Sequence, residues 1–434
     1  MTPLTAHPSP RFGGETDLPG DKSISHRALI LAALANGTSR ITGLLASDDV
    51  RATEEAVKAF GAHVERDSEG AALVTGRTWQ SPAEPVDCGN SGTSARLLMG
   101  AAAGFEGLAA TFTGDASLSS RPMDRITQPL RRMGASIDGG ETLPLDLIGA
   151  RLGGIDYASP VASAQVKSAI LLAGLRTDAP VRIVEPRPSR DHTEIMLAQF
   201  GVEGGVEEVE EGVAITLGEQ RRLTATELHV PGDPSSAAFI WAAAAMIPGA
   251  RVTTRGVLVN ATRTGFIEKI EEMGAAVTLD NHVLRSGEPV GDVTVAHDRL
   301  EPVHVRPEEV PAMIDEIPML ACVAALAEGE SVFEGIGELR VKESDRIGAV
   351  AAGLTANGVT AFATEDSLRV IGNGAVAGGR MVSTRHDHRI AMAFLTLGLA
   401  AKAAITVDNA EPIATSFPDF TALMRGLGAG IATR

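Results

Sequence analysis

The chain has 434 residues but few cysteines and few aromatic residues: 2 Cys, 12 Phe, 2 Trp and 1 Tyr. Two cysteines, Cys88 and Cys322, are too few for a disulfide framework or a four-cysteine zinc site, which favours a reducing compartment. So few aromatic side chains argue against a stacking surface for single-stranded nucleic acid. The longest wholly apolar run, Ala237–Ile247, has 11 residues, whereas a membrane-spanning helix needs about 20.

Positive charge is also scarce. The chain has 38 Lys plus Arg against 55 Asp plus Glu, a formal net charge of −17, which argues against a basic face for duplex nucleic acid. With 44% hydrophobic and 21% charged residues, a large folded core is possible. The length predicts at least two domains. We therefore expect a soluble, cytoplasmic protein with no nucleic-acid or membrane partner.

A repeat runs through the whole chain. In each copy a helical segment ends in an apolar or small residue followed by glycine and a strand-forming stretch. The glycines are Gly61, Gly134, Gly201, Gly274, Gly358 and Gly428, with spacings of 73, 67, 73, 84 and 70 residues. Each glycine suits the position after a helix, where a left-handed backbone costs a glycine little.

A second repeat interleaves with the first. Stretches rich in Ala and Leu lead through a short turn into a β-branched strand, and they are apolar almost all round, which predicts helices buried on every side. They cover residues 26–36, 94–104, 165–175, 236–247, 316–327 and 388–401. The fold class is therefore α/β, with two similar domains, each of three α/β units of about 70 residues around buried parallel helices.

Two near-identical turns mark the domain boundaries. Leu18-Pro19-Gly20-Asp21 precedes the first repeat and Val230-Pro231-Gly232-Asp233 precedes the fourth. We expect one domain from residues 21–233 and the other from residues 1–20 plus 234–434. Two crossings of the chain near 19–21 and 231–234 would form a hinge.

Polar and basic residues gather just before the buried helices. Lys22, Arg27 and Gln165 stand at such starts, and helix N-termini bind anions through unpaired N–H groups. Basic residues oppose the helix dipole there, so Lys22 and Arg27 need a reason other than capping. For Ser235 and Ser236 capping is the simpler interpretation.

Connecting segments add further charges. Arg121, Arg190 and Arg346 follow or precede predicted helices, and arginine suits bidentate binding of carboxylate and phosphate. Asp315 and Glu343 are carboxylates in comparable places. Each alone could be a solvated surface charge. Together they predict small polyanionic substrates and acid–base chemistry.

Other kinds of site find no support. The Gly89–Thr93 stretch lacks the spacing and lysine of a P-loop, and no dinucleotide-binding glycine motif follows a predicted strand. His386 and His388 alone are weak support for a metal. Cys322 falls in a buried helix and Cys88 near a turn, and for both we favour a structural role.

Long ordered motifs carry a family resemblance over essentially the whole chain. They are Leu18–Arg27, Gly89–Thr93, Arg121-Pro122-Met123 and Lys342–Arg346. With the six repeats, these motifs resemble the 5-enolpyruvylshikimate-3-phosphate synthases, also called 3-phosphoshikimate 1-carboxyvinyltransferases. Ser163–Ser168 and Arg190–Glu194 resemble the second bacterial class of that family.

The resemblance implies a reaction and a fold. The enolpyruvyl group of phosphoenolpyruvate would pass to the 5-hydroxyl of shikimate 3-phosphate with release of phosphate, a step of the shikimate pathway towards chorismate and the aromatic amino acids. It implies the enolpyruvyl transferase fold, which resembles an inside-out α/β barrel, and a monomer with no metal and no organic cofactor.

The resemblance also implies a set of substrate-binding residues. Those for shikimate 3-phosphate would be Lys22, Ser23, Arg27, Ser163, Ala164, Gln165, Arg190, Asp315 and Lys342. Those for phosphoenolpyruvate would be Lys22, Gly92, Arg121, Gln165, Glu343, Arg346 and Arg389. Among them, Asp315 is a candidate base for the 5-hydroxyl. Either Lys22 or Glu343, kept protonated by its surroundings, would give a proton to C3.

Two positions and one rival enzyme qualify the resemblance. Thr415 stands where the first class has a lysine that contacts phosphoenolpyruvate. Gly92 stands where some second-class members have an alanine, so we predict more sensitivity to the inhibitor glyphosate than in a Gly92→Ala variant.

UDP-N-acetylglucosamine 1-carboxyvinyltransferase shares the reaction type, but usually has a cysteine in the loop that is Gly114–Arg121 here, which contains none. A non-catalytic anion-binding relative would have lost Lys22, Asp315 or Glu343.

Overall fold

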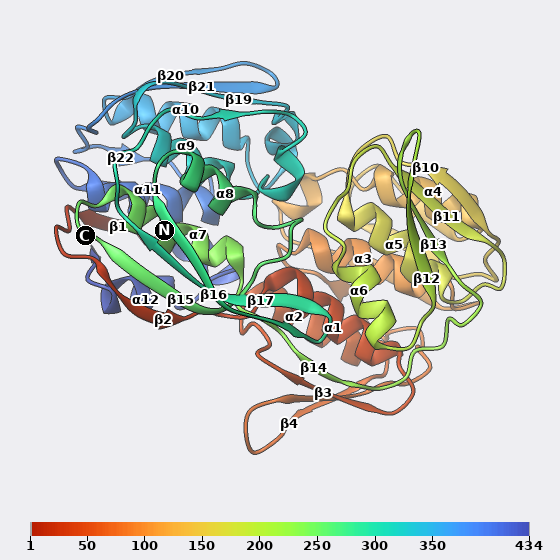
Figure 1. Cartoon of the computed structure of the whole chain (residues 1–434). Coiled ribbons are helices and arrows are strands. Elements are labelled where there is room, and N and C mark those ends of the chain that lie inside the picture. Colours follow the sequence, from red (N-terminus) through yellow and green to blue (C-terminus); the bar gives the residue numbers. More distant parts are fainter. Residues whose placement is uncertain (1, 434) are drawn as a thin grey trace. The chain divides into compact units, whose positions relative to one another are not determined.

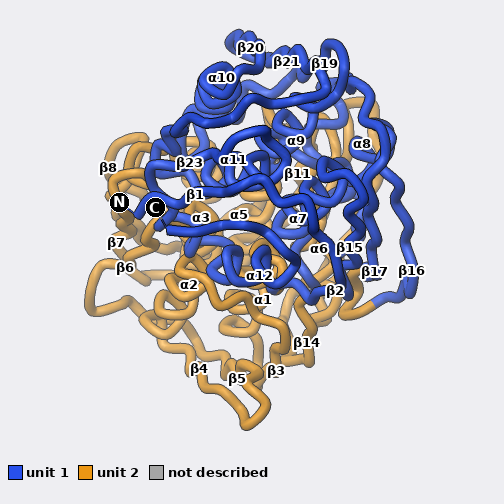
Figure 2. The backbone as a smooth tube through the Cα atoms, turned by 90° about the vertical axis from the view of Figure 1, so that its left-hand side faces the viewer, with its two compact units in different colours: residues 1–19, 231–284, 289–434 blue, residues 20–230, 285–288 orange. Residues whose placement is uncertain are grey.

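The computed structural model describes residues 2–433, which divide into two compact units (Figure 2). Unit 1 holds residues 2–19, 231–284 and 289–433, and unit 2 holds residues 20–230 and 285–288. The segment 285–288 was not expected in the second unit. It belongs there because Ser286 Oγ accepts a hydrogen bond from the His229 N–H at 2.9 Å and Glu288 contacts His192 at 2.7 Å.

Buried helices form the interior of unit 2. They are α1 (Lys22–Leu34), α3 (Gly92–Ala103) and α5 (Ala164–Gly174), which match three of the predicted apolar stretches. Shorter helices with one exposed face pack beside them: α2 (Asp48–Ala59), α4 (Asp124–Met133) and α6 (His192–Gln199). The 3-10 helix η1 (Leu118–Ser120) precedes α4.

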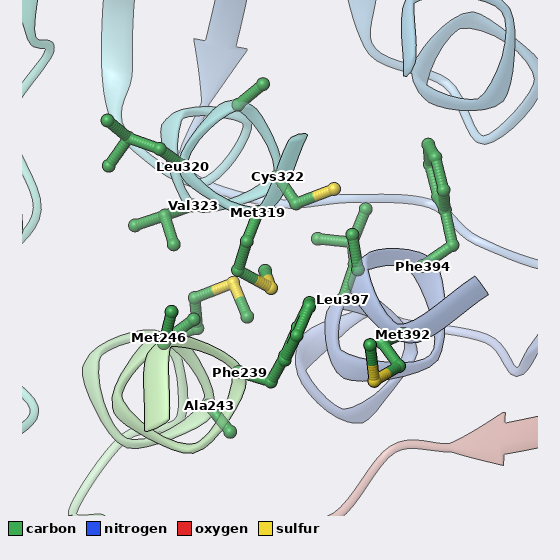
Figure 3. Close-up of a cluster of buried hydrophobic side chains, with 14 of the residues drawn as sticks. Phe239, Ala243, Met246, Met319, Leu320, Cys322, Val323, Met392, Phe394 and Leu397 are labelled. Carbon is green, nitrogen blue, oxygen red and sulfur yellow. The ribbon is translucent and has the colours of Figure 1, made fainter. Parts of the chain in front are cut away.

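Unit 1 repeats this plan. Its buried helices are α7 (Pro234–Met246), α9 (Ile317–Ala324) and α11 (His388–Ala400). Side chains such as Phe239, Met319 and Leu397 interlock between them (Figure 3). The flanking helices are α8 (Gly265–Glu272), α10 (Arg346–Ala356) and α12 (Phe420–Gly426), with 3-10 helices η2 (Val310–Ala312), η3 (Gly337–Val341) and η4 (Glu411–Thr415). Small Ala side chains in these helices leave room for large side chains, such as Phe239 and Phe394, to pack between them.

Four-stranded sheets lie at the periphery of each unit, with the helices between them (Figure 1). In every sheet the first strand pairs in parallel with the second, and the second pairs antiparallel with the third. In unit 2 the orders are β14 (Glu227–His229)–β3 (Thr38–Thr42)–β5 (Ala72–Thr75)–β4 (His63–Arg66), β6 (Val86–Asp87)–β7 (Ala109–Thr113)–β9 (Leu145–Ile148)–β8 (Ser136–Gly139), and β10 (Ile155–Ala158)–β11 (Val181–Glu185)–β13 (Gly212–Leu217)–β12 (Gly204–Val209).

The sheets of unit 1 have the same pattern. Their orders are β2 (Gly13–Asp17)–β15 (Arg251–Leu258)–β17 (Glu288–Ala296)–β16 (Ala276–Arg285), β18 (His304–Val305)–β19 (Glu328–Glu334)–β21 (Ser367–Asn373)–β20 (Thr360–Ala363), and β22 (Met381–Val382)–β23 (Ile405–Val407)–β1 (Leu4–His7)–β24 (Gly430–Thr433). Strand β1 inserts between β23 and β24, so the start of the chain completes a sheet built by its end. In unit 2, β14 comes from the end of the unit, lies at the edge of the first sheet and pairs in parallel with β3.

The repeating glycines end helices as predicted. All of them have positive φ: Gly61 107°, Gly134 116°, Gly201 86°, Gly274 111°, Gly358 87° and Gly428 104°. The predicted fold class, two similar α/β halves with buried helices, is confirmed. Within residues 2–433, no helix combines the length and the apolarity that crossing a membrane would require.

Candidate functional site

Most of the predicted site residues lie at or near helix N-termini. In unit 2, Lys22, Gly92 and Ala164 are the first residues of α1, α3 and α5, and Ser163 is the N-cap of α5. Arg121 follows η1, and Arg190 lies just before α6. In unit 1, Arg346 begins α10 and Arg389 is the second residue of α11. These places combine basic side chains with the positive ends of helix dipoles, which suits anionic ligands.

The start of α1 is fixed by carboxylates. Asp21 caps the helix by accepting a hydrogen bond from the Ile24 N–H at 2.8 Å. The Lys22 ammonium group forms an ion pair with Asp49 of α2, whose side chain is 6% exposed. Lys22 itself remains 20% exposed, so it is oriented by a buried partner and still reaches solvent.

Arg27 crosses from α1 to two other helices. Its Nε donates to Thr193 Oγ1 of α6 at 2.7 Å, and its Nη2 donates to Ser168 Oγ of α5 at 2.7 Å. The guanidinium also donates to the Ser23 carbonyl at 3.0 Å. Nη1 of Arg190 lies 3.5 Å from Ser23 Oγ. The structure thus brings three residues predicted for shikimate 3-phosphate together: Ser23, Arg27 and Arg190.

A second group surrounds the start of α3. Arg121 is 6% exposed, and its Nη2 donates to Asn90 Oδ1 at 2.7 Å and to Ser117 Oγ at 3.0 Å. Gln165 accepts from Arg96 Nη1 at 2.9 Å and donates to Thr93 Oγ1 at 3.0 Å.

Gly92 lies against the guanidinium groups of this second group. A Cβ built on Gly92 would be 2.5 Å from Arg96 Nη1 and 3.5 Å from Arg121 Nη1. Three residues predicted for phosphoenolpyruvate therefore lie around the start of α3. Gly92 lies next to Arg121 and Arg96, and Arg96 is hydrogen-bonded to the third, Gln165.

The predicted residues of unit 1 form one ion-pair network around Arg346, which is 1% exposed. Its guanidinium contacts Asp387 at 2.8 Å, Glu343 at 2.5 Å and Asp315 at 3.3 Å. Lys342 Nζ lies 3.6 Å from Asp315. Burial alone would lower the pKa of Arg346, but the nearby carboxylates, Asp387 foremost, outweigh burial and raise it.

Asp387 joins Arg389 to this network. As the N-cap of α11 it accepts a hydrogen bond from the Arg389 N–H at 2.9 Å, and it also accepts one from Ser344 Oγ at 3.0 Å. Nη1 of Arg389 lies 3.8 Å from Glu316. Glu343 precedes α10, so its contact with Arg346 is made from the segment before the helix and not within a helical turn.

Several residues of these networks were not predicted as part of the site. They are Asp49, Arg96, Ser168, Thr193 and Asp387. Asp387 and Asp49 could have been suspected, because each stands in or next to a helix-start motif. The hydroxyl partners of Arg27 lie within the Ser163–Ser168 and Arg190–Glu194 motifs, but nothing local to either motif indicates a contact with Arg27.

Other titratable groups are suited to packing. Burial raises the pKa of both Cys88 and Cys322, which keeps these buried thiols protonated. Burial, with the nearby charges of Lys22 and Arg27, holds the pKa of His26 well below its usual range. Its Nδ1 instead hydrogen-bonds Thr53 at 2.7 Å. Among residues 2–433 no group of three His, Cys, Asp or Glu side chains has a metal-binding arrangement.

Ser235 and Ser236 differ from the capping interpretation. The cap of α7 is Asp233, which accepts a hydrogen bond from the Ser235 N–H at 2.9 Å. The Ser235 hydroxyl contacts Glu316 and accepts from Arg263 at 2.9 Å, and Ser236 donates to Asp233 at 3.0 Å. Both serines are therefore part of a buried polar network beneath the helix start.

Sequence and structure comparisons agree with this picture. The family model described as EPSP synthase (3-phosphoshikimate 1-carboxyvinyltransferase) matches residues 7–424. A curated relative of that name from Caulobacter vibrioides (strain NA1000 / CB15N) is 50% identical over 99% of this chain and 98% of its own length. Another from Phenylobacterium zucineum (strain HLK1) is 52% identical over 99% of this chain and 95% of its own.

Solved structures extend the comparison. EPSP synthase from Acinetobacter baumannii has a TM-score of 0.86 and 41% identity, with 100% of each chain covered. The enolpyruvyl transferase NikO from Streptomyces tendae has a TM-score of 0.79 and 20% identity, covering 100% of this chain and 99% of its own. The second likeness shows the fold alone.

Proposed function

The chain belongs to the EPSP synthase family, and we propose that it transfers the enolpyruvyl group of phosphoenolpyruvate to the 5-hydroxyl of shikimate 3-phosphate. Phosphate and 5-enolpyruvylshikimate 3-phosphate are the products, in the shikimate pathway. The observation that carries this proposal is the family match over residues 7–424, a range that includes every predicted site residue. The prediction of this family and of a transferase is confirmed.

Unit 2 supplies cations for two anionic substrates in this proposal. Shikimate 3-phosphate and phosphoenolpyruvate each carry a phosphate and a carboxylate, so they repel each other. Arg27 and Arg190 beside Ser23 would hold shikimate 3-phosphate, while Arg121 near Gly92 and Gln165 would hold phosphoenolpyruvate. The α5 start, with Ser163, Ala164 and Gln165, offers helix N–H groups to an anion.

Unit 1 supplies the proposed base. We assign Asp315 as the base that takes the proton of the 5-hydroxyl while that oxygen attacks C2 of phosphoenolpyruvate. C3 gains a proton in the same step and gives a tetrahedral intermediate. In the second step the new methyl group loses a proton and phosphate leaves. Lys342 and Arg346 beside Asp315 would stabilise the negative charges that develop.

The donor of the C3 proton is either Lys22 or Glu343. The 2.5 Å contact with the Arg346 guanidinium makes the Glu343 carboxylate a hydrogen-bond acceptor. Glu343 would therefore have to take up a proton before it could deliver one. Lys22, paired with Asp49, is the alternative donor. No metal ion or organic cofactor takes part in either assignment.

The reaction also bears on domain motion and location. The hinge near 19–21 and 231–234, expected from the two crossings of the chain, is part of this proposal. A closing site would exclude water from the intermediate. We further propose that the protein acts as a monomer in the cytoplasm, as its family membership and its two buried, free cysteines suggest.

Phosphate release tests the function. Purified protein mixed with shikimate 3-phosphate and phosphoenolpyruvate should release phosphate, and omission of either substrate should stop the release. UDP-N-acetylglucosamine in place of shikimate 3-phosphate should give none. If phosphoenolpyruvate gives release with UDP-N-acetylglucosamine but not with shikimate 3-phosphate, the result would instead support the rival enzyme. If neither acceptor gives release, the result would support a non-catalytic relative.

A further inference from the structure

We propose that Glu185 is a positioning residue for shikimate 3-phosphate. Glu185 is the last residue of β11 and is 1% exposed. It would act through two segments of unit 2 that are predicted to hold this substrate, the start of α5 and the segment that ends at Arg190. The inference rests on the proposed function, because it concerns the same substrate.

One carboxylate ties these two segments together. Oε1 of Glu185 accepts a hydrogen bond from the Ser163 main-chain N–H at 3.0 Å, which fixes the N-cap of α5. Both oxygens lie 2.8 Å from the hydroxyl of Ser189, the residue before Arg190. Since Ser163 and Arg190 are separated by 27 positions in the chain, their relative placement depends on this shared acceptor.

A buried lysine forms an ion pair with this carboxylate. Lys167 of α5 is 2% exposed, and its Nζ lies 3.0 Å from Glu185 and 2.8 Å from Glu194 of α6. It also donates to the Ser189 carbonyl at 3.4 Å. Burial would lower the pKa of Lys167, but the two carboxylates outweigh burial and raise it.

The second carboxylate of this cluster has a different role. Glu194 Oε2 is buried without a hydrogen-bond partner among the described residues. Burial raises the pKa of Glu194, although Lys167 opposes the effect. With one cation between two carboxylates, Lys167 offsets only part of the effect of burial on Glu194.

Stability alone does not explain such a cluster, because a protein with apolar residues of similar volume in place of a buried ion pair is often at least as stable. Its contacts point to a different use. Apart from the ion pairs within the cluster, its hydrogen bonds are made to Ser163 itself and to Ser189, the residue before Arg190. Small displacements of binding groups weaken binding strongly, so the cluster fits a positioning role.

The experiment compares wild type with Glu185→Gln in the full chain. The variant keeps the shape and one carbonyl acceptor but places an amide N–H₂ group where Lys167 and Ser189 now donate. We expect the Kd for shikimate 3-phosphate, measured by calorimetry without phosphoenolpyruvate, to rise about 10- to 100-fold. KM for this substrate should rise in parallel, while kcat falls less than about 3-fold, since no reacting atom is touched.

Two further variants separate positioning from stability. Lys269→Gln in unit 1 breaks another buried pair, in which Lys269, 5% exposed, lies 2.9 Å from Glu309. It should lower the melting temperature without changing the Kd. Ser189→Ala retains the Lys167–Glu185 pair and should raise the Kd about 3- to 10-fold, so it tests the idea even if Glu185→Gln fails to fold.

The outcomes are distinct. If wild type binds and turns over shikimate 3-phosphate but Glu185→Gln and Ser189→Ala bind it as wild type does, the positioning role is wrong and the proposed function stands. If folded wild type neither binds nor turns over this substrate, the proposed function fails, and the inference fails with it. A raised Kd in both Glu185→Gln and Ser189→Ala, but not in Lys269→Gln, supports the role.

Discussion

Each unit has a buried cation that holds several carboxylates, yet the two cations differ in what they hold. In unit 2, Lys167 contacts Glu185 and Glu194 at 3.0 and 2.8 Å, and neither carboxylate is a predicted substrate contact. In unit 1, Arg346 contacts Glu343 and Asp315 at 2.5 and 3.3 Å, and both carboxylates are predicted to act on substrate. The pKa of each cation is raised by its carboxylates in spite of burial.

The difference lies in how far each network stands from the proposed chemistry. The Lys167 cluster fixes main-chain segments, so its influence on a ligand would be indirect. The Arg346 network contains the proposed base itself, and its guanidinium, which can bind several oxygens at once, sets the relative positions of these carboxylates. In the proposed roles, a buried cation paired with carboxylates would support the backbone in unit 2 and take part in acid–base chemistry in unit 1.

The strongest prediction contrasts two helix starts, one in each unit. Lys22→Met at the start of α1 should abolish turnover, a loss of about 10³-fold or more in kcat, because it removes a cation that is proposed to contact both substrates and is a candidate donor of the C3 proton. Ser235→Ala at the start of α7 should cost about 1–3 kcal/mol of stability, since Glu316 and Arg263 lose a buried partner.

Phosphate release and urea unfolding of both variants measure the contrast. Circular dichroism controls for the fold of Lys22→Met, whose side chain is partly exposed. If Lys22→Met and Ser235→Ala lost similar amounts of activity, the start of α1 could not be distinguished from the start of α7 as the one that acts on substrate.

A second prediction tests the two buried cations directly. Arg346→Met should lower kcat/KM by about 10²- to 10³-fold, because Asp315 and Glu343 lose the group that orients them. Lys167→Met should instead change kcat little. It should lower stability by about 3–5 kcal/mol and raise KM for shikimate 3-phosphate, because it leaves Glu185 buried without its cation.

Steady-state kinetics and urea unfolding on the same preparations give both quantities. Experiments at a temperature where Lys167→Met is fully folded separate its kinetic effect from unfolding. An equal loss of kcat in Arg346→Met and Lys167→Met would mean that both networks contribute equally to the chemical step, and the proposed difference between the two units would be wrong.

Much of the fold could be predicted from local patterns. The glycines ending the flanking helices require a left-handed backbone, and the apolar stretches predict buried helices, so both signals lie within a few residues of each element. The membership of residues 285–288 in unit 2 could not be predicted. Ser286 and Gly287 are typical of a hairpin turn, and nothing local indicates the contact between Glu288 and His192.

The site divides in the same way. Lys342, Glu343 and Arg346 stand within one motif, so their charges could be grouped before the structure was known. Glu185 could not, since a glutamate at the end of a strand is usually exposed. Its partners Ser163 and Lys167 are 22 and 18 positions away, and only the packing of α5 beside β11 brings them to it. Which of the predicted residues act on substrate remains a prediction.

The smallest effect is expected at Gly92, where unit 2 places guanidinium groups against a bare backbone. A methyl group in Gly92→Ala would lie 2.5 Å from Arg96 Nη1, so that flexible side chain must move and the space beside Arg121 must shrink. We expect the inhibition constant for glyphosate to rise about 10-fold or more, and KM for phosphoenolpyruvate to rise less, at the scale of one methyl group in a binding site. Inhibition kinetics against phosphoenolpyruvate measure both. An unchanged inhibition constant would show that the α3 start does not contact the inhibitor. The assignment of Gly92 to phosphoenolpyruvate would then be wrong, because the added methyl group would occupy the space that this assignment gives to the ligand.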